Sequence, residues 1–434
     1  MKYVRSAKRL TATSVLSKMV PCCLWPIIAL AHPDEIGLDE VRTATQASGE
    51  AVSYKFDVLA NEIYVIKLDQ AGLDFVLTVE GPNYGERTFN SPLRRDDREL
   101  VLLEPDTTGE YRITVRSDEP SNARGQHTLR IKRAPNQTAD DRRYIDAMRL
   151  MSVAGTEYDA EDRDSSLRAL NAYRRAETIW QELGIKREQA QALYSVAMLE
   201  YWAAYDWSRS AAMAAQASAI YRELGFEQLY ANALMLQGTA LIEAANELGP
   251  RDAQATLAAA LELFGVAKST HERLKNEFAL AHLSNNVGLT YFYMGDWDRA
   301  RTLWGDSAQQ FQALGDWREE LNARQNQAVI DGLQGYNKRA IETLQYIIDS
   351  LPNDSDLQFR VNVIDNLAEN YRLYGEYEDA LQAYSTAHAI HRRIGDGIGE
   401  AYALTGIGNT YYSIGELDLA GRYLEQALPL AEES

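Results

Sequence analysis

Asparagines recur at a regular interval in the second half of this 434-residue chain. Asn286, Asn326 and Asn366 are forty residues apart. Four further candidates for the same site lie close to this row: Asn285, Asn362, Asn409 and Tyr412. An amide side chain both donates and accepts hydrogen bonds, so a row of amides matches the main chain of an extended peptide. The same amides could instead bond neighbouring helices. The spacing therefore predicts a peptide-binding row, with structural bonding as the alternative.

Motifs of catalysis or metal binding are not found in the sequence. It contains no H-E-x-x-H, G-x-S-x-G or G-x-x-x-x-G-K-[ST]. His388 and His391 have helical i, i+3 spacing, but no third ligand is evident, so we interpret them as surface histidines. The acidic run at 158–164 could meet Ca²⁺, but acids also suit a helix start, and we favour a cap. We expect no enzyme, cofactor or metal site in these residues.

The N-terminus has the pattern of a secretory signal. Five basic residues precede a short apolar run, and Ala29-Leu30-Ala31 forms an A-x-A cleavage signal. We expect cleavage after Ala31, a secreted or periplasmic bacterial protein, and no membrane contact after cleavage. The two cysteines, Cys22 and Cys23, both lie in this leader. The mature chain would therefore contain neither a disulfide nor a thiol nucleophile.

The charge of the chain restricts its partners. The formal net charge is −19, and such a chain repels the phosphates of nucleic acids. Along the asparagine row, Asp365 and Glu369 outnumber the single cation Arg372. We therefore expect a protein or peptide partner with a neutral or basic segment.

Residues 45–133 alternate in hydrophobicity like short strands. Six runs with period two are separated by turn residues, which predicts a small antiparallel β-sandwich. The stretches "YKFDVLANEIYVIKL", "LDFVLTVEGPNYGE" and "EPDTTGEYRITVRS" resemble the bacterial pre-peptidase C-terminal family. That resemblance implies a jelly-roll-like accessory domain of a secreted protein. Residues 134–139 read as a linker, and we expect the domains on either side of it to fold separately.

From residue 140 the pattern is helical and repeats about every forty residues. Units start near 140, 191, 231, 281, 321, 361 and 401. Self-similarity at this period predicts an α-solenoid. Small residues recur where paired helices cross, and glycines recur at the turns, for example Gly295 and Gly415.

The junctions "GDWDRA", "GEYEDA" and "GELDLA" resemble tetratricopeptide repeats. This resemblance implies a right-handed solenoid of about seven helical hairpins, so the expected fold is mainly α with a small β-sandwich in front. In such solenoids the first helix of each hairpin lines the concave face. "LSNNVG" and "VIDNLA" look like the asparagine ladder of kinesin-light-chain-like repeats, which binds peptides.

These observations favour a secreted scaffold that holds a peptide or partner protein in the concave groove. One alternative is kept. The order of signal, pre-peptidase-like domain and repeats resembles the N-terminal half of secreted CHAT-domain proteins, whose caspase-like peptidase domain would lie beyond Ser434. The last helix also carries apolar residues on more than one side. We expect a continuing domain, the partner, or a second copy bound through the C-terminal repeat to cover it.

Overall fold

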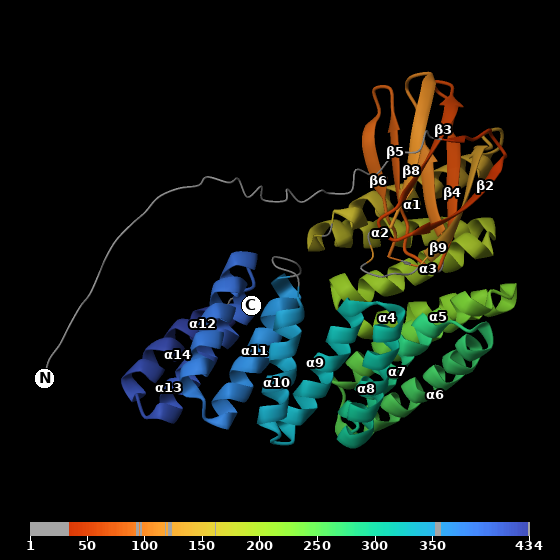
Figure 1. Cartoon of the computed structure of the whole chain (residues 1–434). Coiled ribbons are helices and arrows are strands. Elements are labelled where there is room, and N and C mark those ends of the chain that lie inside the picture. Colours follow the sequence, from red (N-terminus) through yellow and green to blue (C-terminus); the bar gives the residue numbers. More distant parts are fainter. Residues whose placement is uncertain are drawn as a thin grey trace, which may run out of the picture.

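A β-sandwich is joined to a curved row of helical hairpins (Figure 1). The structure is a computed structural model, and it describes residues 34–92, 95, 98–117, 119, 124–160, 162–351 and 357–432. The predicted signal peptide, residues 1–31 with its cleavage site at Ala31, lies outside the described residues. Within the described part, none of the helices combines the length and apolarity needed to span a membrane.

The sandwich consists of two sheets. The first has the order β1-β3-β8-β5-β6, and the second has the order β2-β9-β4-β7. All pairings are antiparallel except that of β1 with β3, which is parallel and joins Asp34 to Tyr54. Strands therefore begin before the predicted start at residue 45. The strand bounds are β1 Asp34–Glu35, β2 Val41–Ala47, β3 Ala51–Val58, β4 Tyr64–Ala71, β5 Val76–Gly81, β6 Gly85–Phe89, β7 Arg98–Leu103, β8 Gly109–Arg116 and β9 Arg124–Arg133.

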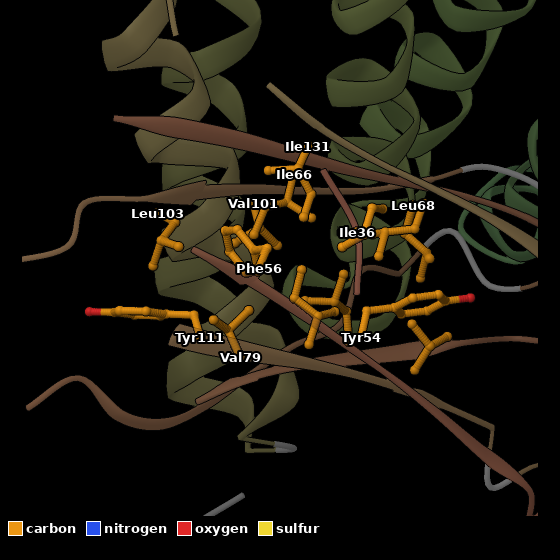
Figure 2. Packing of buried hydrophobic residues seen from close by; sticks show 14 of the residues in the cluster. Ile36, Tyr54, Phe56, Ile66, Leu68, Val79, Val101, Leu103, Tyr111 and Ile131 are labelled. Carbon is orange, nitrogen blue, oxygen red and sulfur yellow. The ribbon is translucent and has the colours of Figure 1, made fainter. Parts of the chain in front are cut away.

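The core of the sandwich lies between the two sheets. Ile66, Val101 and Ile131 of the second sheet face Val79 and Tyr111 of the first (Figure 2). These residues come from alternate positions of their strands, as the period-two pattern predicts, because successive side chains of a strand point to opposite faces.

The second sheet is buried on its other face as well. Val65 of β4 and Leu100 and Leu102 of β7 point away from the sandwich and share one apolar cluster with the first three helices. Lys67 adds an ion pair to Glu188 at 2.9 Å. The sandwich thus rests on the start of the solenoid and shares an apolar cluster with it (Figure 1). Separate folding of the two parts stays a prediction.

The predicted linker is short and bonded at both ends. The Ala134 amide donates to the Ile63 carbonyl oxygen at 2.7 Å. Thr138 caps the first helix, with a reciprocal capping box to Asp141. These contacts leave little freedom between the sandwich and the helices that follow.

Seven helical hairpins follow one another in the described residues, in agreement with the predicted mainly α solenoid. Each hairpin begins within about five residues of its predicted start. The bounds are α1 Ala139–Asp159 with α2 Arg163–Leu183, α3 Lys186–Leu199 and η2 Glu200–Ala204 with α4 Trp207–Leu224, α5 Glu227–Ala245 with α6 Pro250–Leu274, α7 Glu277–Tyr293 with α8 Trp297–Leu314, α9 Trp317–Leu333 with α10 Asn337–Ser350, α11 Leu357–Tyr374 with α12 Tyr377–Ile394, and α13 Gly397–Ile414 with α14 Leu417–Glu432.

The small residues do lie where the paired helices cross. A Cβ atom added to Gly288 would lie 2.9 Å from the Trp304 ring, and one added to Gly238 would lie 2.6 Å from the Phe264 ring. The predicted turn glycines Gly295 and Gly415 have positive φ, 82° and 96°. Left-handed backbone at the end of a helix favours glycine because it lacks a Cβ atom.

The second hairpin departs from this pattern. Tyr205 occupies the position that corresponds to Gly295 ninety residues later, yet it has a φ of 57°. The turn before it is the π-helix η2 rather than α-helix. Positive φ is strained for a bulky residue, and π-helical turns are often found at functional sites.

Candidate functional site

A groove of about 670 Å³ runs along the concave face, lined by the first helices of the second to sixth hairpins. Amides from four of these helices face it: Asn232 on α5, Asn285 and Asn286 on α7, Asn322 and Asn326 on α9, and Asn362 on α11. The forty-residue period places these amides in one groove because each repeat adds a helix in the same register.

The groove amides also bond the helices to one another. Asn286 Nδ2 donates to Thr239 Oγ1 at 3.1 Å, and Asn326 Nδ2 donates to Asn285 Oδ1 at 3.2 Å. These bonds link α5 to α7 and α7 to α9. A primary amide has two N–H donors and an acceptor oxygen, so each bond uses part of its capacity. The structural alternative is therefore present at three of the predicted positions, Asn285, Asn286 and Asn326, which also line the groove.

Three of the predicted residues lie outside this lining. Asn366 Nδ2 donates within its own helix to the Asn362 carbonyl oxygen at 3.0 Å. Asn409 and Tyr412 are exposed on α13, and 68% of Tyr412 is accessible to solvent. The groove therefore brings together Asn285, Asn286, Asn326 and Asn362 from the predicted set.

One end of the groove is aromatic and apolar, a feature that the repeat pattern does not predict. Tyr194, Met198, Tyr201 and Trp202 line it from α3 and η2. Trp202 is 60% exposed, and its ring meets the Tyr201 ring edge-on with centroids 4.8 Å apart. The sequence does carry a signal for this region, since Tyr205 replaces the turn glycine of later units.

A buried carboxylate with two arginine partners helps to hold the π-helical turn in place. Glu200 is 1% exposed and pairs with Arg174 and with Arg209, whose Nε lies 3.1 Å away. Arg163 Nε donates to the Ala203 carbonyl oxygen at 3.2 Å. The Asp206 amide closes the turn onto the Glu200 carbonyl oxygen at 2.9 Å. These contacts stabilise a turn that presents Trp202 to the groove.

The sandwich also contributes to the groove. Arg95 is buried, with its guanidinium carbon 3.4 Å from the centre of the Phe278 ring of α7. Its Nε donates to Glu119 at 2.7 Å, and it lies 3.5 Å from Asp316 at the start of α9. Burial raises the pKa of the Asp316 carboxyl. These residues are far apart in sequence, so no local pattern predicts that they meet.

His391 differs from its interpretation as a surface residue, whereas the His388 side chain is partly exposed, with Nε2 3.0 Å from Glu400 Oε1. His391 is buried, with Nε2 2.8 Å from Asp365 Oδ2 and Nδ1 2.9 Å from Asp396 Oδ2. Burial raises the pKa of Asp365 to about 6. Asp396 also caps α13, so the three side chains connect α11, α12 and α13. In the described ranges no group of three or more histidine, cysteine or acidic side chains has the arrangement of a metal site.

The acidic run at 158–164 serves as a helix cap. Asp162 accepts a hydrogen bond from the Ser165 amide at 2.8 Å, at the start of α2. A carboxylate at this position satisfies a free N–H group and interacts favourably with the helix dipole.

Comparison with known proteins supports the fold. Residues 360–433 match the family described as tetratricopeptide repeat. No curated protein matches the chain in sequence. Among solved structures, aspartyl phosphate phosphatase F from Bacillus subtilis has a TM-score of 0.50 and 15% identity, and the match covers 68% of this chain and 72% of that one.

Two Rap proteins match a comparable share of the chain. The apo form of RapI has a TM-score of 0.48 and 16% identity, with 68% of this chain and 100% of that chain covered. A Rap protein complexed with competence and sporulation factor has a TM-score of 0.47 and 16% identity, covering 69% and 77%. The tetratricopeptide repeat match covers residues 360–433, and the helical hairpins before it continue the same mainly α architecture.

Proposed function

We propose that this protein is an interaction scaffold that binds an extended segment of a protein or peptide in the concave groove. The observation that carries the proposal is the convergence of amides from α5, α7, α9 and α11 on one groove. Amides on successive helices can pair with successive peptide groups of an extended chain. The chain as a whole is acidic, which favours a neutral or basic segment.

A peptide library gives the test. Random linear peptides displayed on phage would be selected on the purified chain, and the affinity of an enriched peptide would be measured by calorimetry. The triple variant Asn286→Ala, Asn326→Ala, Asn362→Ala should weaken binding by about two orders of magnitude, because each lost hydrogen bond contributes about 1 kcal/mol. Asn409→Ala is the matched control, since Asn409 is an exposed amide outside the groove.

Two results would contradict this function. One is a library that yields no peptide binding to the folded chain. The other is a triple variant that binds as tightly as the parent while its melting temperature falls, which would assign the amides to the bonds that link α5, α7 and α9.

The C-terminal repeat is proposed as a second contact surface, for self-association. Leu417, Leu424 and Leu428 of α14 are at least 40% exposed. Replacing Leu424 and Leu428 by serine should shift the chain toward monomer in sedimentation velocity if copies meet there. An unchanged sedimentation profile would argue against this surface.

The cellular setting remains a proposal from the sequence. Export to the periplasm or the medium rests on the leader and the cleavage signal at Ala31, and N-terminal sequencing of exported protein should begin at His32. The CHAT-domain alternative rests on the order of segments, and in-frame coding sequence for a Cys–His peptidase domain after Ser434 would support it.

A further inference from the structure

The aromatic end of the groove continues one helical turn beyond the residues described above. Thr239 and Glu243 are four residues apart on α5, as are Leu289 and Tyr293 on α7. Residues at this spacing lie on the same face of a helix. Thr239 and Leu289 line the groove, so Glu243 and Tyr293 extend it toward Tyr201 and its neighbour Trp202 on η2.

Glu243 is a partly buried carboxylate in this aromatic surrounding. Tyr201 donates its hydroxyl hydrogen to Glu243 Oε1 at 3.3 Å, and Asn246 Nδ2 lies 3.5 Å from Oε2. Across the residues that the structure describes, no lysine or arginine forms an ion pair with Glu243, whereas buried Glu200, one residue before Tyr201, has two arginine partners. Burial raises the pKa of Glu243, consistent with a charge that lacks a cation.

Two aromatic rings at this end of the groove present open surface. Trp202 is 60% exposed and Tyr293 is 38% exposed. Tyr293 is close enough to Glu243 that this carboxylate helps to raise the pKa of its phenol, after burial itself. Aromatic faces attract cations through the ring quadrupole, and a nearby carboxylate adds a direct charge interaction.

We propose that Tyr201, Trp202, Tyr293 and Glu243 form a cation subsite that takes a lysine or arginine side chain of the bound segment. The proposal deepens the proposed function and rests on it for the identity of the ligand as a polypeptide. The π-helical turn places Trp202 at this subsite, which gives the strained backbone at Tyr205 a role. The main chain of the segment would lie along the amides, and its basic side chain would anchor the end near α3.

A small probe tests the subsite separately from peptide binding. Nα-acetyl-lysine methylamide would be titrated into the ¹⁵N-labelled chain, with the Trp202 indole N–H resonance assigned by Trp202→Phe. We expect a saturable shift of that resonance. Nα-acetyl-norleucine methylamide, which has a similar stem without the charge, should bind on the order of tenfold more weakly. Absence of a saturable shift, or equal binding of both compounds, overturns the subsite whatever the peptide library yields.

Substitutions test whether the charge of Glu243 is responsible for binding the lysine compound. Glu243→Gln keeps an acceptor for the Tyr201 hydroxyl and removes the charge, and it should reduce the affinity for the lysine compound on the order of tenfold. Glu262→Gln is the matched control, because Glu262 is exposed on α6, outside the groove lining. Tyr293→Leu removes an aromatic face and should also weaken binding. If Glu243→Gln binds the lysine compound as tightly as the parent does, the proposal is wrong. An equal loss of affinity in Glu262→Gln would indicate a general effect of charge and would also overturn the proposal.

The peptide library distinguishes binding that uses the cation subsite from binding that uses the amides alone. Enriched peptides that share a basic residue, and lose affinity when it is replaced by norleucine in the parent but not in Glu243→Gln, support the subsite. Peptides that depend on Asn286 and Asn326 without any basic residue would leave the scaffold function standing and overturn the cation subsite.

Discussion

Gly288 lies where α7 crosses α8, and the neighbouring ring leaves no space for a side chain. A Cβ atom there would lie 2.9 Å from Cδ1 and Nε1 of Trp304. Trp304 is buried and its Nε1 donates to the Asn285 carbonyl oxygen at 3.0 Å. The ring is therefore held by packing and by a hydrogen bond, so it cannot move aside without cost.

The first prediction compares two glycines. Gly288→Ala should lower the free energy of unfolding by about 1–3 kcal/mol, because the added methyl group overpacks the crossing. Gly265→Ala is the matched control. Gly265 lies inside α6 with open space around it, so alanine should stabilise the helix by about 1 kcal/mol. Thermal melts followed by circular dichroism would measure both, and shifts of the same sign would contradict the packing argument.

His127 gives the sandwich a dependence on pH. It is fully buried between Tyr54 and Phe75, with its Nε2 2.7 Å from the Tyr54 hydroxyl oxygen. Burial lowers the pKa of His127 to about 4. Because the unfolded chain binds a proton at higher pH than the folded chain, this group favours folding above about pH 6.5 and loses that contribution as the pH falls toward 4.

The second prediction follows from that sign. Between pH 6.5 and pH 4 the free energy of unfolding should fall by on the order of 3 kcal/mol, because His127 takes up a proton more readily in the unfolded chain. His127→Gln keeps a polar partner for Tyr54 and should flatten this part of the stability curve. Denaturant unfolding at several pH values measures the slope. A His127 ring that titrates near pH 6.5 in NMR would refute the prediction.

At the scale of elements, the second hairpin shows how a repeat is altered without losing the fold. Its first helix ends in η2, and the turn uses Tyr205 in place of glycine. Arg163 offsets part of the cost of this strained turn, because its guanidinium lies 5.2 Å from the centre of the Tyr205 ring. The altered turn therefore depends on side-chain contacts from α2 and α4, whereas the fourth to seventh hairpins each have a glycine of positive φ at this turn.

The third prediction tests that dependence. Glu200→Gln should destabilise the protein by about 1–2 kcal/mol, because it removes a buried carboxylate charge that pairs with two partly exposed arginines, Arg174 and Arg209. Glu223→Gln is the matched control. Glu223 is exposed and pairs with Lys186 at the surface, so its loss should change stability by less than about 1 kcal/mol. Equal melting temperatures for the two variants would show that η2 does not depend on Glu200.

At the scale of the whole molecule, the sandwich and the solenoid share a core. Val65, Leu100 and Leu102 pack with residues of α1, α2 and α3, such as Met148 and Trp180. Lys67 and Arg98 both lie near Glu188 of α3, at 2.9 and 3.2 Å. Arg95 extends this contact to the groove. A partner in the groove would therefore lie against both parts of the protein.

The fourth prediction concerns this shared core. Leu100→Ala with Leu102→Ala should lower stability by at least about 4 kcal/mol, since each truncation leaves a cavity that costs about 2–5 kcal/mol. The loss should appear in the helical signal as well as in the sandwich. Leu59→Ala is the control, because Leu59 is 47% exposed. A double variant whose helical melt is unchanged would instead support two independently folding domains.

The sequence by itself determined the repeat and its hairpins. A small residue at a helix crossing and a glycine at a turn are local requirements between neighbouring segments, so forty-residue spacing was enough to place Gly288 and Gly295. The period-two pattern likewise predicted most strands of the sandwich. The parallel pairing of β1 escaped prediction because two residues are too few to show a period.

Only the tertiary structure decided which polar residues meet. Asn286, Asn326 and Asn366 share one register in the sequence, yet Asn366 bonds its own helix and lies outside the groove. Which residues line the groove depends on how several hairpins curve together. It also depends on residues of the sandwich such as Arg95, which is far away along the chain. Likewise Glu243 meets Tyr201, a residue of η2 on a different hairpin, through a hydrogen bond. Such contacts arise from the packing of distant segments, for which a one-dimensional pattern carries no signal.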